Sequence, residues 1–276
     1  MTFFITDLDG TLIHSKRFIP YSLKLRIVEY DKKGKALSYM TSESYKYFKS
    51  LNKLIRIIPI TSRSIEQYKR ISFAKDFLIA VTSNGGTILY NGKEDLAWKQ
   101  HIKDKFRELE QRQSIEDILN KIMSFSITKY KLIDNSYYYF KIDNIKEAKK
   151  ILDKELPIDW YYIIQKNKLY IMPKFISKYE ALKYLEDKYL VNLEESYGAG
   201  DSIQDKDFLF NVKNKITFIS TKEHSCDLWE NLTTEEKNLF SVFSYGLIGT
   251  EDLLKFLNRF VIQENEKIER KLNDKI

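Results

Sequence analysis

Residues suited to chemistry lie near the start of the chain, in the run Asp7-Leu8-Asp9-Gly10-Thr11. Asp7 and Asp9 are two positions apart, so on an extended chain their carboxylates point to the same side. Two carboxylates this close repel each other, and the arrangement therefore needs a bound cation or a shared proton. Gly10 lets the backbone approach a ligand and present its amide. The alternative is a strand that ends in a polar turn, but such a pentapeptide arises by chance in only ~2 or 3 per thousand chains of this length.

The elements around this run predict a parallel α/β sheet. Four short apolar runs are typical of buried strands: Thr2–Thr6, Leu54–Ile60, Phe77–Thr82 and Ile216–Ser220. Ser42 to Leu54 has helical spacing, and Ser64 with Gln67 fits a capping box that begins a helix. Alternating strands and helices favour a parallel sheet, which binds ligands at the carboxyl ends of its strands. Asp7 and Asp9 are expected at that edge.

The middle of the chain predicts a small α+β module. We expect helices over His101–Met123 and Asn144–Leu156, the first of them long and charged. Two hairpins are expected, one from Phe125–Asp134 and Tyr137–Ile142, the other from Ile158–Gln165 and Leu169–Met172. A module of this α-β-β-α-β-β order, inserted into a parallel sheet, divides the chain into two domains. The expected boundaries are a discontinuous core of residues 1–86 and 174–276 and an inserted domain of residues 87–173.

A lysine at a predicted helix start is a further candidate site residue. Ser177 and Glu180 form a capping-box pattern that makes Lys178 the first helical residue. The N-terminus of a helix favours an anion, and a lysine there can reach the edge of the sheet. Lys174 lies close by in the sequence and is the alternative to Lys178.

An acidic segment comes after the expected strand Val191–Tyr197. In Gly198-Ala-Gly200-Asp201-Ser-Ile-Gln-Asp205, two glycines fit a turn from strand to loop. Asp201 and Asp205 are four positions apart and share a face if the loop opens a helix. The alternative is an acidic surface turn. Beyond this segment, we expect Thr250 to cap a final helix, with apolar positions that pack in the core.

The run Phe3 to Leu12, F-F-I-T-D-L-D-G-T-L, resembles the first motif of the haloacid dehalogenase-like (HAD) phosphatases. Further segments resemble the other motifs of that family in the expected order: Pro59 to Arg63, Lys178 at its helix start, and Gly198 to Asp205. The chain departs from the family pattern where Ser62 and Tyr179 replace common glycines and Gln204 replaces the usual Asn. The resemblance covers nearly the whole chain. The order of the inserted module is similar to the C2B cap of Cof-like and sucrose-phosphate phosphatases.

The resemblance implies a fold, a reaction and a set of site residues. The fold is α/β, a Rossmann-like parallel-sheet HAD core with an inserted small α+β cap of the C2B type. The reaction is Mg²⁺-dependent hydrolysis of a phosphomonoester, such as a sugar phosphate, through an aspartyl-phosphate. Asp7 is then the nucleophile and Asp9 the general acid and base. The resemblance further implies that the phosphate is held by Gly10, Thr61, Ser62 and Lys178, and Mg²⁺ by Asp7, Asp9, Asp201 and Asp205.

Composition excludes several other classes of protein. The chain has 276 residues, of which 43% are hydrophobic, enough for a sizeable core. The single cysteine, Cys226, excludes an internal disulfide framework. No apolar run approaches the roughly 18 residues of a membrane span, and the N-terminus shows no secretory leader. We therefore expect a cytoplasmic protein with no membrane partner.

The net charge of +7 is compatible with nucleic-acid binding, but its distribution favours another interpretation. Most of the cations are lysines interleaved with Asp and Glu, whereas Arg is preferred for recognising phosphates and bases. We expect a solvated surface and a small phosphorylated substrate, with no nucleic-acid partner. Two alternatives stay open: a phosphomutase of the phosphomannomutase type, and a non-catalytic protein that binds a phosphate ligand on the same fold. The sequence carries no signal for the substrate's identity or the oligomeric state.

Overall fold

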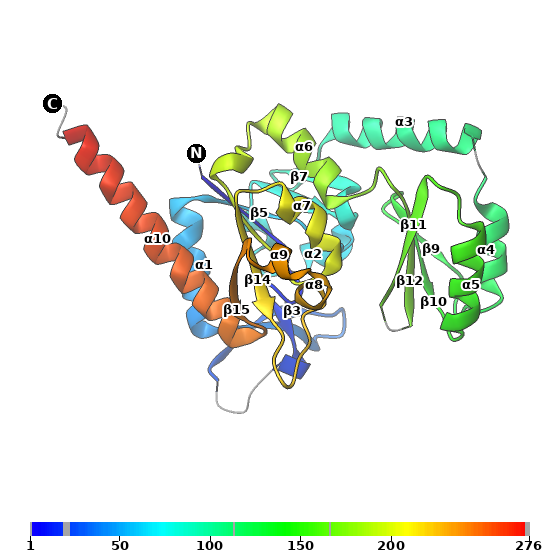
Figure 1. Cartoon of the computed structure of the whole chain (residues 1–276), viewed down its shortest axis with the longest axis horizontal. Coiled ribbons are helices and arrows are strands. Elements are labelled where there is room, and N and C mark those ends of the chain that lie inside the picture. Colours follow the sequence, from blue (N-terminus) through cyan, green and yellow to red (C-terminus); the bar gives the residue numbers. More distant parts are fainter. Residues whose placement is uncertain (1, 19–22, 113, 166, 274–276) are drawn as a thin grey trace.

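A five-stranded parallel sheet places the acidic segments next to each other. The computed structural model describes residues 2–18, 23–112, 114–165 and 167–273 (Figure 1). The strand order is β15-β14-β13-β1-β5, and all neighbouring pairs are parallel. These strands are β1 (Phe3–Thr6), β5 (Arg56–Pro59), β13 (Tyr197–Ala199), β14 (Asn214–Ile219) and β15 (Phe240–Ser244). Every residue of β1 is buried, so both faces of the sheet are covered there, which explains its continuous apolar run.

Helices of the core pack against this sheet in one hydrophobic cluster. They are α1 (Ser42–Leu54), α2 (Ile65–Lys69), α6 (Lys178–Tyr189), α7 (Lys206–Phe210), α8 (Asp227–Asn231) and α10 (Leu247–Asn273). The short α9 (Thr234–Lys237) has no buried residue. α1 and α10 lie side by side, and the Asn258 amide donates to the Tyr47 carbonyl at 2.8 Å. The far end of α10 projects beyond the core (Figure 1).

Two small antiparallel sheets flank the parallel sheet. The first has the order β2-β4-β3, with β2 (His14–Ser15), β3 (Leu25–Tyr30) and β4 (Ala36–Thr41). The second joins β6 (Ile79–Thr82), β7 (Thr87–Tyr90) and β8 (Lys93–Glu94). Short 3₁₀ turns complete the core: η1 (Lys16–Phe18), η2 (Ala74–Asp76), η3 (Ser83–Gly85), η4 (Leu193–Glu195) and η5 (Ile203–Asp205). The β3–β4 hairpin is absent from the sequence-based prediction.

A four-stranded antiparallel sheet stands beside the core, with helices on its outer side (Figure 1). Its order is β11-β12-β10-β9, formed by β9 (Lys131–Ile133), β10 (Tyr137–Lys141), β11 (Trp160–Gln165) and β12 (Lys168–Pro173). The helices on that side are α4 (Glu116–Met123) and α5 (Ile145–Glu155), whereas α3 (Leu96–Arg112) runs from the core to this sheet (Figure 1). Alternate residues of the strands, such as Phe140, Leu169 and Ile171, pack with α4 and α5 in a second hydrophobic cluster. The other face of this sheet is directed toward the core.

The expected long helix over His101–Met123 is wrong, because the structure has two helices there. α3 begins earlier, at Leu96, where Asp95 accepts hydrogen bonds from the amides of Ala97 and Trp98. It ends at Arg112, and α4 begins at Glu116. α3 already reaches both cores, with Trp98 in the first cluster and Leu109 in the second. After the break, α4 packs in the second cluster alone, through Ile118 and its neighbours.

Several other expected element limits are also corrected. Leu54 ends α1 instead of opening a strand, and the strand over Phe125–Asp134 is only the short β9. β6 pairs antiparallel with β7 and joins the parallel sheet through one bridge, between Ile60 and Val81. The polar segment before Tyr197 forms η4 rather than a strand. Thr250 lies inside α10, which begins at Leu247, and its hydroxyl donates to the Thr11 carbonyl at 2.6 Å instead of capping the helix.

The predicted fold class is confirmed: a mixed α/β chain with a parallel central sheet and an antiparallel sheet beside it. α1 and the capping box of Ser64 also occur as predicted. The domain boundaries at residues 86 and 174 stay a prediction. Within the described part of the chain, no helix combines the length and apolarity needed to cross a membrane.

Candidate active site

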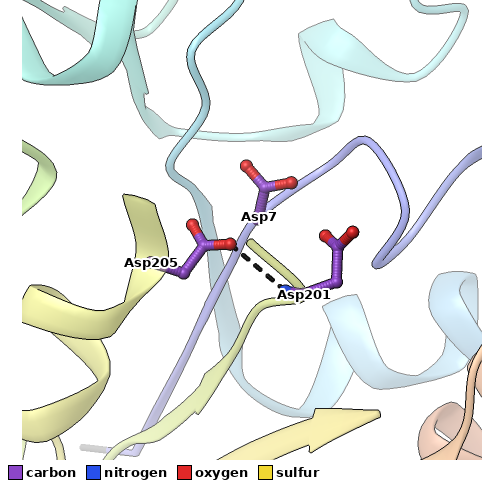
Figure 2. Close-up of side chains that lie close together, drawn as sticks. All are labelled: Asp7, Asp201 and Asp205. Carbon is purple, nitrogen blue, oxygen red and sulfur yellow. Dashed lines mark hydrogen bonds between the residues drawn. The ribbon is translucent and has the colours of Figure 1, made fainter. Parts of the chain in front are cut away.

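Three buried aspartates meet at the carboxyl edge of the parallel sheet. Asp7 directly succeeds β1, Asp201 lies in the loop after β13, and Asp205 ends η5. One carboxylate oxygen from each lies within 4.8 Å of the others (Figure 2). Since β1 and β13 are parallel neighbours, the residues after them are brought to one edge although the sequence separates them widely. We call Asp7, Asp201 and Asp205 the acidic cluster.

Lys178 is the cation that faces the acidic cluster. Its ammonium lies 2.6 Å from Asp7 Oδ1 and 2.5 Å from Asp205 Oδ1. It is the first residue of α6, and the Ser177 hydroxyl accepts from the Glu180 amide as the N-cap. The Lys178 side chain is only 2% exposed, whereas Lys174 is exposed. Burial disfavours the charged ammonium, but Asp205 and Asp7 outweigh it and raise the pKa of Lys178.

The acidic cluster carries more negative charge than Lys178 neutralises. Burial raises the pKa of Asp7 well above its usual range; Lys178 opposes this, and Asp205 and Asp201 add to it. Burial and then Asp205 raise the pKa of Asp201 to about 7, against the hydrogen bonds from Tyr245 and Thr11. Carboxylate oxygens are the ligands that Mg²⁺ prefers. The excess charge, the burial and the oxygen donors therefore fit a divalent cation.

Asp201 is held at both oxygens by residues from other elements. The Tyr245 hydroxyl donates to Oδ2 at 2.6 Å, and the Thr11 hydroxyl donates to Oδ1 at 2.9 Å. Gly10 is required beside them: its φ is +92°, and a Cβ there would lie 2.2 Å from Asp201 Oδ2. Tyr245 lies just after β15 and is not among the residues predicted from the sequence. No local pattern marks it, because only the folding of the sheet brings this loop to Asp201.

Asp9 does not point toward the acidic cluster, and the expectation that both carboxylates face one spot is wrong. After β1 the chain turns: the amides of Leu12 and Ile13 both donate to the Leu8 carbonyl at 2.9 Å. The side chain of Asp9 is 52% exposed and accepts two hydrogen bonds from Arg63, from Nε at 2.5 Å and from Nη2 at 2.7 Å. The relation between positions i and i+2 holds only for an extended chain. In the same turn the Gly10 amide donates to the Ile13 carbonyl at 2.9 Å.

The hydroxyl segment after β5 lies beside Asp7, because β5 is the other parallel neighbour of β1. Thr61 is buried at 1% exposure, and its amide donates to the Val81 carbonyl at 2.9 Å. The Thr61 hydroxyl accepts from the Arg63 amide at 3.2 Å. Thr61, Ser62 and Arg63 thus form a tight turn at the edge that also carries Asp7.

The small sheet touches this turn and its surroundings through polar side chains. The Tyr137 hydroxyl donates to the Ser62 carbonyl at 2.9 Å. Asp134, in the turn between β9 and β10, accepts from the Ile65 amide at 2.8 Å and from the Ser83 hydroxyl. Burial, then Tyr139 and Asp9, raise the pKa of Tyr170 on β12 to about 12. The face opposite α4 and α5 is therefore directed toward the candidate site.

Comparisons with known proteins identify the family and the fold. The sucrose-6F-phosphate phosphohydrolase family model matches residues 1–244. A comparison with curated proteins finds no match.

Solved structures share the fold at low sequence identity. The sucrose-phosphatase of Synechocystis sp., solved with sucrose and phosphate, is 15% identical with a TM-score of 0.61, covering 93% of this chain and 98% of that one. A Thermoplasma acidophilum protein has the same identity and coverage and a TM-score of 0.59. A HAD-superfamily phosphatase of Bacteroides thetaiotaomicron is also 15% identical, with a TM-score of 0.54 and coverages of 93% and 95%. The chain therefore belongs to the sucrose-6F-phosphate phosphohydrolase family of HAD-like phosphatases.

Proposed function

We propose that this phosphatase hydrolyses a small phosphomonoester, such as a sugar phosphate, with Mg²⁺ and through an aspartyl-phosphate on Asp7. The observation that carries the proposal is the buried acidic cluster with Lys178 set against it, 2.6 Å from Asp7. A buried carboxylate held by one ammonium at a sheet edge is suited to attack a phosphorus atom. The family membership supports the reaction class.

In the first step, an Asp7 oxygen forms a bond to phosphorus and the ester P–O bond breaks. Asp9 gives a proton to the leaving oxygen. In the second step, a water attacks the aspartyl-phosphate, Asp9 takes a proton from that water, and inorganic phosphate leaves as the Asp7 carboxylate is regenerated. Lys178 orients Asp7 and balances part of the charge on the phosphoryl oxygens.

The residues that would hold Mg²⁺ are the carboxylates of Asp7, Asp201 and Asp205, together with the backbone carbonyl of Asp9. When bound, Mg²⁺ neutralises charge on the phosphoryl group and polarises it. Tyr245 and Thr11 keep the Asp201 carboxylate turned toward Asp7.

We propose that the phosphate is held by Thr61, Ser62 and Lys178 and by an amide near Gly10. The Gly10 amide itself donates to Ile13 in the described turn, so this contact requires the turn to adjust or a neighbouring amide to serve. We also propose that residues 87–173 act as the cap that selects the rest of the substrate, over a core of residues 1–86 and 174–276. The sucrose and phosphate bound to the Synechocystis neighbour support a sugar phosphate as substrate.

The test is hydrolysis of a panel of phosphomonoesters with and without Mg²⁺, with Asp7→Asn as the nucleophile control. We expect release of phosphate that requires Mg²⁺ and is lost in Asp7→Asn, and we expect Asp9→Asn to be inactive as well. Full turnover in Asp7→Asn would remove the nucleophile assignment. Isomerisation of a hexose 1-phosphate without release of phosphate would replace hydrolysis by a phosphomutase reaction. Binding without turnover would leave a ligand-binding role.

A further inference from the structure

Glu29 is a buried carboxylate outside every motif of the sequence. It lies on β3 and is 1% exposed. The pairing of β3 with β4 is irregular on both sides of it, with register shifts between Ile27 and Glu29 and between Glu29 and Tyr30. Such bulges redirect a side chain and are common beside active sites. Here the irregularity places an ionisable group in the interior, where it needs compensating partners.

Both oxygens of Glu29 are occupied by donors. Oε2 accepts from Arg63 Nη2 at 2.9 Å and from the Ser38 hydroxyl at 2.6 Å. Oε1 accepts from Arg70 Nε at 3.1 Å. Burial acts to raise the pKa of Glu29, but the hydrogen bonds and charge of Arg63, with help from Ser38 and Arg70, outweigh it and lower that pKa. Glu29 is therefore a fixed anion at neutral pH.

Arg63 connects this fixed anion to Asp9. Its guanidinium is planar, and its side chain is 11% exposed. Nη2 donates to both Glu29 and Asp9, and Nε donates to Asp9 alone. Because Glu29 is buried and Asp9 is half exposed, Glu29 sets the plane of the guanidinium, and that plane in turn orients Asp9. The guanidinium also donates from Nη1 to the Gln67 carbonyl and from Nη2 to the Ser38 hydroxyl, both at 3.3 Å, so Glu29 is its charged partner on the buried side.

We propose that Glu29 is a positioning residue, which orients the carboxyl group of Asp9 for proton transfer through Arg63. This inference rests on the proposed role of Asp9. When Asp9 is protonated, one of its oxygens keeps an Arg63 hydrogen bond while the other, carrying the proton, faces the leaving group. The ester P–O bond breaks and that proton passes to the leaving oxygen. Buried ion pairs add little net stability compared with apolar side chains, so stability alone does not account for this one.

The test compares two esters that differ in their need for a proton. An alkyl phosphate, such as glucose 6-phosphate, leaves as an alkoxide that must be protonated, whereas p-nitrophenyl phosphate leaves as a stable phenolate. We expect Glu29→Gln to lower kcat for the alkyl ester by about tenfold or more, with KM little changed, because general acid catalysis is impaired. The loss of kcat/KM for p-nitrophenyl phosphate should be several times smaller. The comparison uses kcat/KM because this constant reports release of the leaving group and not the hydrolysis of the aspartyl-phosphate, which is common to both esters. Glu29→Asp, which keeps the charge, should recover part of the difference.

Arg70→Lys is the matched control, because Arg70 contacts the same carboxylate from the side that does not lead to Asp9. Arg70→Lys should leave the ratio of kcat/KM for the two esters at the wild-type value. Melting temperatures are measured for every variant, and Ser38→Ala serves as a second, milder variant if Glu29→Gln does not fold. The inference, but not the proposed function, would be overturned if Glu29→Gln lowered kcat/KM equally for both esters. The same holds if Arg70→Lys changed the ratio of the two constants as much as Glu29→Gln does. A wild-type protein inactive on both esters would instead overturn the proposed function on which it rests.

Discussion

The ammonium of Lys178 lies 2.6 Å from the Asp7 carboxylate, although 171 positions separate the two residues. α6 begins at Lys178, and its N-cap Ser177 fixes the direction in which the helix starts. Lys178 pairs directly with Asp7 and Asp205, two of the three buried carboxylates of the acidic cluster. The site therefore retains an excess of negative charge that a divalent cation can balance.

Replacing Lys178 should impair both turnover and the stability of the metal-free protein. We expect Lys178→Met to lower kcat by about 10²–10³-fold, as loss of one stabilising donor does in other enzymes. Breaking a buried ion pair costs about 3–5 kcal/mol, so the melting temperature without metal should fall. Adding Mg²⁺ should restore much of the lost melting temperature, because the uncompensated carboxylates then have a cationic partner. Lys174→Met is the control, and wild-type turnover in Lys178→Met would contradict the assignment.

Tyr245 should control metal affinity through Asp201. Removal of its hydroxyl in Tyr245→Phe leaves Asp201 Oδ2 without the donor at 2.6 Å. Since residues that orient metal ligands affect affinity by one to two orders of magnitude, we expect Mg²⁺ to bind roughly tenfold more weakly. Isothermal calorimetry measures this directly, without turnover. Tyr189→Phe removes a comparable hydroxyl, 2.7 Å from Asp95, and should leave Mg²⁺ binding unchanged.

The stabilising effect of Mg²⁺ should increase with pH. The pKa of Asp201 is about 7 in the folded protein, mainly because of burial, against 3.8 as the ordinary value. The folded protein without metal thus binds this proton more tightly than the unfolded chain, so its stability falls as pH rises between these two values. Mg²⁺ competes with the same proton. The rise in melting temperature on adding Mg²⁺ should therefore be larger at about pH 8 than at about pH 6. In Asp201→Asn, the rise should differ less between the two pH values.

His14 should make the protein sensitive to acid. Its Nε2 lies 2.7 Å from the Thr250 hydroxyl in the core, and burial lowers its pKa from 6.5 to about 3. The unfolded chain therefore binds a proton that the folded protein does not, and stability is lost as pH falls below 6.5, by about 2 kcal/mol at about pH 5. The raised pKa of Asp201 changes the stability in the opposite direction over this range, so the contribution of His14 is read from the difference between proteins in urea unfolding at about pH 7 and about pH 5. On going to about pH 5, His14→Gln should be less destabilised than the wild type, whereas His101→Gln, at an exposed position, should match the wild type. Equal changes in all three proteins would exclude His14 as the cause.

The hydroxyl of Tyr137 should help to hold the phosphate. It donates to the Ser62 carbonyl from the small sheet, and thereby holds the turn of Thr61 and Ser62. We expect Tyr137→Phe to weaken inhibition by inorganic phosphate by about threefold to tenfold, the usual effect of one hydrogen bond. Tyr162→Phe is the control, because its hydroxyl contacts Asp153 within the same module. Equal inhibition constants in Tyr137→Phe and the wild type would show that the contact does not reach the site.

The sequence alone determined the features that depend on local pattern. The apolar run before Asp7 predicted a buried strand, and the capping pattern around Ser177 placed Lys178 at the start of a helix. The turn expected at both glycines before Asp201 is wrong for Gly198, which lies within β13, whereas Gly200 follows the strand. Alternating strands and helices then predicted the parallel sheet. The resemblance to the HAD motifs implied that these residues would meet, and the parallel sheet accounts for it, because the carboxyl ends of parallel strands share one edge.

The tertiary structure decided the features that depend on contacts between distant segments. Asp9 turned away from Asp7 because the chain leaves its extended conformation directly after β1, where Arg63 from another strand end becomes its partner. Tyr245 and Glu29 carry no motif, and they reach the site only because a loop after β15 and an irregular hairpin fold back onto it. The break between α3 and α4 likewise depends on tertiary packing, because α3 extends from the first hydrophobic cluster to the second and α4 packs in the second alone. Side-chain direction and pairing of this kind are set by packing in three dimensions, which no local spacing encodes.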